Sequence, residues 1–274
     1  MTTPNATALG HVVSKDGTQI AFDRIGSGAP LILVDGALSS RTAGLNGALA
    51  AQLAPHFTVY TYDRRGRGDS GDTAAYAIDR EIDDIEALVS EAGGSAGLYG
   101  ISSGGALALD AANRLGPRIT KLAIYEAPFV VDDTRAPLPD GYLQKMRDLV
   151  AADRRGEAVD LFMGKGIGLP GWMVVMLRLL PSRSGQKALA HTLPYDATIM
   201  GDSQSGRPLS RERWASITAP TLVVAGGKSP VWMKHAQLAL AAVLPNGTHQ
   251  VLAGQMHIVK AEALAPMLDA FFAA

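Results

Sequence analysis

The sequence has no cysteine among its 274 residues. This absence excludes disulfide bonds, a cysteine nucleophile and thiolate metal ligands. The sequence also lacks an apolar run approaching the ~20 residues that a membrane-spanning helix needs. Its start, Met1 to Gly10, lacks the charged and then apolar build of a signal peptide. We therefore expect a cytoplasmic protein that does not act at a membrane.

The sequence also lacks an excess of charge of either sign, since the formal net charge is −1. A balance so close to zero does not favour nucleic acid or an anionic membrane surface as the main partner. We expect a small-molecule substrate, a monomer or small homo-oligomer, and neither a metal nor another cofactor. Apolar residues make up 47% of the chain, which is enough to build the core of one large α/β domain.

The most informative stretch is the G-x-S-x-G pattern centred on Ser102, with Gly100 and Gly104 on either side. It follows an apolar run and precedes a helical pattern, which is typical of a nucleophile elbow at a sharp strand-to-helix turn. Glycines suit this turn because larger side chains would collide with the crossing strand and helix. Alone, the pattern is equally compatible with a glycine- and serine-rich loop without chemistry.

Strands and helices are predicted to alternate along most of the chain. A hairpin is expected near the Asp16-Gly17 turn, and buried strands and amphipathic helices follow. This alternation predicts a parallel sheet with helices on both faces. From residue 130 to about 215 the pattern changes to helices and loops separated by prolines. We therefore expect a core of residues 1–129 and 216–274, with a helical cap of residues 130–215 inserted after the sixth strand.

In parallel sheets, ligands bind beyond the carboxyl ends of the strands. Ser102, Glu126 and His257 each follow a predicted strand, in the order serine, acid, histidine. This order and placement match the arrangement of a nucleophile, its orienting acid and its general base in α/β-hydrolases.

On these features the chain resembles the α/β-hydrolase superfamily over nearly its full length. It looks most like the compact bacterial esterases and cofactor-free haloperoxidases that carry a helical cap. The resemblance implies a mostly parallel, eight-stranded sheet flanked by helices. The segments that carry it are Val34-Asp35-Gly36, Tyr62 to Ser70, the elbow at Ser102, and Gly254-Gln255-Met256-His257.

The resemblance also implies roles for individual residues. Ser102 would attack an electrophilic carbon, and His257 would take its proton and return it to the leaving group. The backbone N–H groups of Ser103 and Ala37 would form the oxyanion hole, where each donor lowers the barrier by roughly 3 kcal/mol.

Two positions depart from the family pattern. Relatives usually carry His-Gly after the third strand, where this chain has Asp35-Gly36. Asp35 could hold the oxyanion loop or could oppose negative charge in the site. The loop of residues 226–230 lacks the usual triad carboxylate, so we expect Glu126 to orient His257. Asp196 is a weaker candidate for this acid, and a solvated glutamate at a strand end is the alternative interpretation of Glu126.

Apolar and aromatic residues of the cap and of the segment after the seventh strand are candidate pocket walls. They could equally pack the cap onto the core. The candidate pocket residues are Asp35, Leu38, Trp172, Met176, Trp232 and Met233. The Arg-rich loop of residues 63–70 is interpreted as a solvated loop with local ion pairs and not as a phosphate site.

A serine at the elbow argues against the relatives that use an aspartate nucleophile for carbon–halogen bonds and epoxides. Esters, lactones, thioesters and activated carbon–carbon bonds remain. The predicted function is a carboxylesterase- or lactonase-like serine hydrolase that cleaves a medium-sized, mainly apolar ester or lactone. The alternatives keep the fold and pocket for a lyase or cyclase reaction, or for binding a small molecule.

Overall fold

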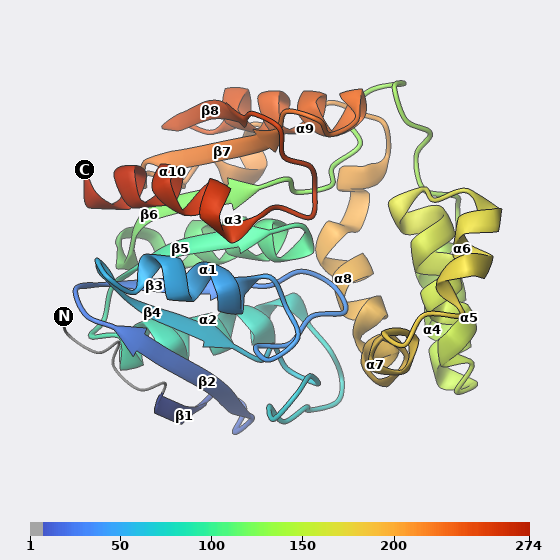
Figure 1. The fold of residues 1–274 in the computed structure, drawn as a ribbon, viewed down its shortest axis with the longest axis horizontal. Coiled ribbons are helices and arrows are strands. Elements are labelled where there is room, and N and C mark those ends of the chain that lie inside the picture. Colours follow the sequence, from blue (N-terminus) through green and yellow to red (C-terminus); the bar gives the residue numbers. More distant parts are fainter. Residues whose placement is uncertain (1–7) are drawn as a thin grey trace.

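The computed structural model describes residues 8–274, which form one eight-stranded sheet in the order β1-β2-β4-β3-β5-β6-β7-β8 (Figure 1). β2 is antiparallel to both of its neighbours, and all other neighbouring strands are parallel. The strands are β1 (Ala8–Val13), β2 (Gln19–Gly26), β3 (Ala29–Val34), β4 (Phe57–Tyr62), β5 (Ala96–Ile101), β6 (Ile119–Tyr125), β7 (Thr221–Gly226) and β8 (Gly247–Leu252).

Helices cover both faces of the sheet because the central strands are apolar on both sides. Leu31 and Leu33 of β3 pack under α1 (Asn46–Leu53) and α10 (Ala261–Ala273). The alternate residues of β3 pack under the helices of the other face, since successive side chains of a strand point in opposite directions. Those helices are α2 (Ile78–Glu91), α3 (Ser103–Leu115) and α9 (Val231–Val243). The predicted mostly parallel sheet between two helical layers is confirmed.

The segment of residues 126–220 joins β6 to β7 and is mainly helical, and we call it the insert. Its helices α4–α7 lie beyond the carboxyl ends of the parallel strands, and α8 lies between them and the sheet (Figure 1). Tyr142, Met146 and Leu193 belong to an apolar cluster of the insert itself. The helices are α4 (Tyr142–Ala151), α5 (Arg155–Leu161), α6 (Gly171–Leu177), α7 (Arg183–Leu189) and α8 (Leu193–Met200). The insert also contains the π-helix η2 (Phe162–Ile167) and the short 3-10 helices η3 (Ala190–Thr192), η4 (Gly201–Gln204) and η5 (Glu212–Trp214). A further 3-10 helix, η1 (Gly116–Arg118), lies between α3 and β6.

None of the helices within residues 8–274 combines the length and the apolar character required to cross a bilayer.

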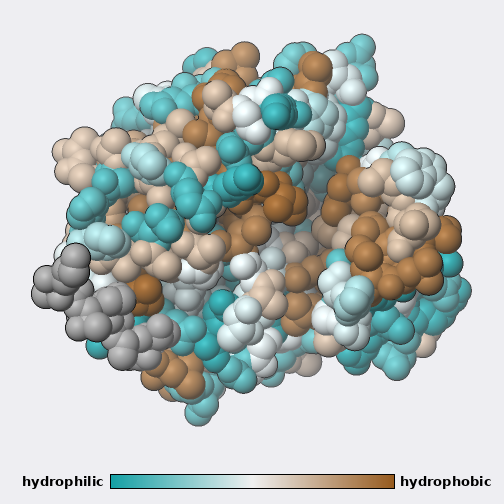
Figure 2. Space-filling view, viewed as in Figure 1, coloured by the Kyte–Doolittle hydropathy of each residue, from teal (hydrophilic) through white to brown (hydrophobic). Residues whose placement is uncertain are grey.

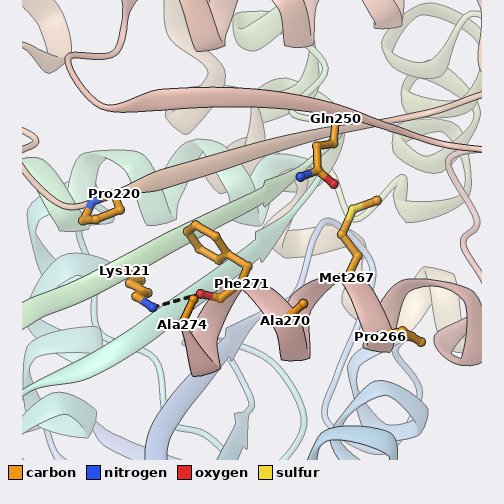
Figure 3. Close-up of a pocket in the computed structure, with 8 residues that line it drawn as sticks. All are labelled: Lys121, Pro220, Gln250, Pro266, Met267, Ala270, Phe271 and Ala274. Atoms are coloured by element: carbon orange, nitrogen blue, oxygen red, sulfur yellow. Dashed lines mark hydrogen bonds between the residues drawn. The ribbon is translucent and has the colours of Figure 1, made fainter.

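An open hollow lies beside α10, and none of Ser102, Glu126 and His257 lines it. Its walls come from α10, from β8 and from the beginnings of β6 and β7 (Figure 3). The ammonium of Lys121 donates to the carbonyl oxygens of Phe271 and Phe272, at 2.9 and 3.3 Å. Lys121 therefore caps the carboxyl end of α10, where a positive charge is favourable.

Candidate active site

Ser102 lies at a strained turn between β5 and α3. Its φ of 58° and ψ of −132° are unusual for a residue with a side chain. The turn is tight, because a Cβ added to Gly104 would lie 2.5 Å from the carbonyl oxygens of Val34 and Asp35. The turn leaves Ser102 half-buried at the carboxyl edge of the sheet, as the elbow pattern predicts.

Glu126 and His257 contact each other at the same edge of the sheet. Glu126 is fully buried after β6, and its Oε2 lies 3.0 Å from Nδ1 of His257. Its other oxygen, Oε1, accepts the backbone N–H of Gly226 at 2.7 Å. Both oxygens of the buried carboxylate therefore have a partner, which offsets the cost of burial. The alternative interpretation of Glu126 as a solvated residue is wrong.

Ser102 lies on the strand end next to Glu126, since its N–H donates to the carbonyl oxygen of Tyr125 at 3.0 Å. Within residues 8–274, its Oγ makes no hydrogen bond, and the His257 side chain is 37% exposed. Hydrogen bonds between nucleophile and base often tighten only when substrate binds. Asp196 was the weaker candidate for the orienting acid. In the structure Glu126 is the acid on His257, while Asp196 contacts Arg64, Arg67 and Ser103.

The two predicted oxyanion donors are available. The backbone N–H groups of Ala37 and Ser103 donate to no protein acceptor within the described part of the chain. The loop after β3 runs close to Ser102, because a Cβ added to Gly36 would lie 2.9 Å from Cβ of Ser102. Unpaired N–H groups beside a serine hydroxyl are what a developing oxyanion requires.

Asp35 is a buried carboxyl group directly before this loop. Burial raises the pKa of Asp35 to about 7, although the positive charges of Arg67 and Arg64 act in the opposite direction. Its carboxyl group lies against Gly44, where an added Cβ would be 2.5 Å from Oδ2. Asp35 therefore lies under the segment that follows the oxyanion loop and is no exposed wall of a pocket.

The Arg-rich loop differs from its prediction. Arg64, Arg65 and Arg67 are buried, and their carboxylate partners include Glu81 of α2 and Asp196 of α8. The interpretation as a solvated loop with local pairs is wrong, because these arginines are buried and their partners lie outside the loop, on α2 and on α8. One signal was present in the sequence: Glu81 lies on the apolar face of its helix, where an unpaired carboxylate would be costly.

The candidate pocket residues divide into two groups. Trp172 and Met176 are 70% and 59% exposed on α6, so they do not form an enclosed pocket wall. Met233 is buried and Trp232 is half-buried, with the guanidinium carbon of Arg135 4.2 Å from a ring centroid of Trp232. Figure 2 shows hydrophobic residues gathered over the insert and along the hollow between the insert and the core.

Leu38 and its neighbour Ala37 pack against the apolar cluster of the insert. The φ of Leu38 is 56°, an uncommon value for a branched side chain. The predicted oxyanion loop therefore contacts the insert directly. Within residues 8–274, no cluster of three or more histidine, aspartate and glutamate side chains is arranged to hold a metal ion.

A sequence model of the alpha/beta hydrolase family matches residues 35–267. The chain belongs to the alpha/beta hydrolase family. This alpha/beta hydrolase is similar to one from Sphaerobacter thermophilus DSM 20745, with 49% identity and a TM-score of 0.89. That similarity covers 96% of this chain and 100% of the other.

Two further solved structures share the fold at lower identity. A thermophilic esterase from Thermogutta terrifontis is 20% identical, with a TM-score of 0.67 over 97% of this chain and 98% of the other. A bromoperoxidase from Bacillus anthracis is 20% identical, with a TM-score of 0.70 over 98% of this chain and 100% of the other. At this identity the likeness shows the fold, and the chemistry has to be argued from the site.

Proposed function

We propose that this alpha/beta hydrolase is a serine hydrolase of medium-sized, mainly apolar esters or lactones. The observation that carries the proposal is the hydrogen bond between the buried Glu126 carboxylate and His257, beside a serine held at positive φ. A buried acid on Nδ1 fixes the imidazole tautomer that leaves Nε2 free to accept a proton.

The reaction proceeds in two halves. Ser102 Oγ attacks the carbonyl carbon while His257 Nε2 accepts the hydroxyl proton, and the carbonyl oxygen becomes an oxyanion. The N–H groups of Ala37 and Ser103 stabilise that charge. Collapse breaks the ester bond, and His257 protonates the departing alkoxide. Water then attacks the acyl-enzyme with His257 as the base, which releases the carboxylic acid and restores Ser102.

The apolar residues of the insert favour an apolar substrate. Ala37 and Leu38 of the loop pack against its apolar cluster, so the insert stands next to the oxyanion donors. We propose that residues 130–215 act as a cap that covers the acyl chain and excludes water from the site.

A series of p-nitrophenyl esters of graded chain length tests the proposal, together with a fluorophosphonate that labels activated serines. We expect turnover that is highest at intermediate chain length, and a covalent adduct that peptide mass spectrometry places on Ser102. Ser102→Ala should lose both turnover and labelling, whereas Ser103→Ala should still be labelled at Ser102. The matched pair identifies which of the two adjacent serines is the nucleophile.

The same experiment separates the alternatives. Labelling of Ser102 without turnover of any ester or lactone would favour a lyase, a cyclase or a binding protein that uses this pocket. A folded protein that is neither labelled nor active would contradict an activated serine.

A further inference from the structure

One buried carboxylate of the insert connects to both segments that supply the oxyanion donors. Oδ1 of Asp196 on α8 accepts the hydroxyl of Ser103 at 2.8 Å. Its Oδ2 accepts a bond from Nη2 of Arg67 at 2.7 Å. The other terminal nitrogen of Arg67, Nη1, donates to the carbonyl oxygen of Gly36 at 2.6 Å. All three side chains are buried.

The contact to Gly36 acts on a particular peptide unit. The carbonyl of Gly36 and the N–H of Ala37 belong to the same planar amide. A charged donor on the carbonyl oxygen fixes the plane of that amide, and it also polarises the N–H at the other end. Arg67 therefore fixes the direction in which the Ala37 N–H points.

The contact to Ser103 acts on the second donor. Ser103 is the first residue of α3, and its N–H follows directly after the nucleophile. Its hydroxyl is held by a carboxylate that is itself held by two guanidinium groups, because Arg64 Nη1 also donates to Asp196 Oδ1 at 2.7 Å. The side chain of Ser103 is thereby fixed to α8.

We propose that Arg67 and Asp196 are positioning residues that orient both N–H groups of the oxyanion hole and link them to the helical insert. The inference rests on the proposed function in naming these N–H groups as oxyanion donors. Displacement of α8 would disturb both donors together, so the position of the insert controls the reactivity of the site.

The charge state of Asp196 suits this role. Burial would raise the pKa of Asp196, but Arg67, Arg64 and the Ser103 hydroxyl hold it below its ordinary value. Asp196 is therefore a carboxylate at neutral pH, and there it accepts hydrogen bonds from Arg67, Arg64 and Ser103.

The loop itself offers a matched control. Arg65 is as buried as Arg67 and also joins a carboxylate to a backbone carbonyl. It donates to both oxygens of Asp84, at 2.8 and 2.7 Å, and to the carbonyl oxygen of Arg80 at 3.0 Å. None of these contacts involves residues 36–37 or 102–103. Arg65→Lys and Arg67→Lys both keep the positive charge and both lose a two-sided contact.

The first readout is steady-state kinetics of the full-length variants. Loss of one oxyanion donor costs about 100-fold to 1,000-fold in kcat, so misorientation in Arg67→Lys should cost at least about 10-fold with KM within about threefold. A boronic acid, which forms a tetrahedral adduct on Ser102, should lose affinity in proportion. Arg65→Lys should keep kcat within about twofold of the wild type. Equal losses in kcat for the two variants would overturn the inference.

The second readout does not depend on turnover. Amide hydrogen exchange of residues 36–39, followed by mass spectrometry, should be faster in Arg67→Lys and Asp196→Asn than in the wild type and in Arg65→Lys. Unchanged exchange in both variants would show that Arg67 and Asp196 do not hold the loop, and would refute the inference. If wild-type Ser102 proved unreactive, the proposed function would fail, and this comparison alone would still decide whether Arg67 and Asp196 hold the loop.

Discussion

Replacement of Asp35 by asparagine should alter how the stability of the protein depends on pH. The substitution keeps the size and shape of the side chain and removes its ionisation. Asp35 is buried against Gly44, and burial raises its pKa from the ordinary 3.8 to about 7. The folded protein therefore retains a proton on this carboxyl group at pH values where the unfolded chain has released it.

The sign follows from this difference in bound protons. Between pH 4 and pH 7, approximately, the folded state binds more protons than the unfolded state, so stability falls as the pH rises. The difference between the two pKa values contributes about 4 kcal/mol to the free energy of unfolding at low pH. This contribution is lost once the pH rises above the pKa of Asp35 in the folded protein. About 2.5 kcal/mol of that loss falls between pH 5 and pH 8. Asp35→Asn should show none of it.

Denaturant unfolding of both proteins at a series of pH values measures the effect, with Trp214, which is fully buried, as a fluorescence reporter. Titrations of other groups cancel when the two proteins are compared at each pH. The variant should gain stability relative to the wild type by about 2.5 kcal/mol from pH 5 to pH 8. Parallel curves for the two proteins would refute the assignment of a raised pKa to Asp35.

Three other substitutions test separate parts of the structure. Glu126→Gln should lower kcat by at least about 100-fold, because the amide no longer fixes the His257 tautomer. An unchanged circular dichroism spectrum would show that the variant is folded, and full turnover would contradict the assignment of Glu126 as the orienting acid. Gly104→Ala should lower the midpoint of thermal unfolding strongly or prevent folding, since its Cβ would meet two backbone oxygens at 2.5 Å. Trp172→Ser should change the unfolding free energy by less than about 0.5 kcal/mol, and an altered preference for ester chain length would show that Trp172 does contact substrate.

The fold could be predicted because its determinants are local along the chain. Apolar runs such as Leu31 to Val34 are long enough for strands buried on both faces, and the intervening segments carry helical periodicity. The turn at Ser102 follows from the spacing of two glycines. Each of these signals lies within about ten residues, so no knowledge of distant contacts was needed.

The exposed face of α6 could not be predicted in the same way. Its residues are apolar on nearly every side. Such a pattern predicts a buried helix but does not show which side of the helix packs against the rest of the protein. In the structure Val174 is buried in the cluster of the insert, while Trp172 and Met176 face outward. A helix of only seven residues has too few positions for periodicity to separate an inner from an outer face.

The buried ion pairs were missed for a different reason. Arg67 and Asp196 are separated by 129 positions in the chain, and each looks like an ordinary surface residue in its own segment. A buried charge is tolerable only when its partner is already in place, so neither residue signals burial alone. Because α8 supplies the carboxylate and the loop after β4 supplies the guanidinium groups, core and insert have to fold together before either charge is satisfied. This mutual requirement holds the insert beside Ser103 and Gly36. Local motifs were enough to predict oxyanion donors at Ala37 and Ser103, whereas the buried partners Arg67 and Asp196 left no local signal.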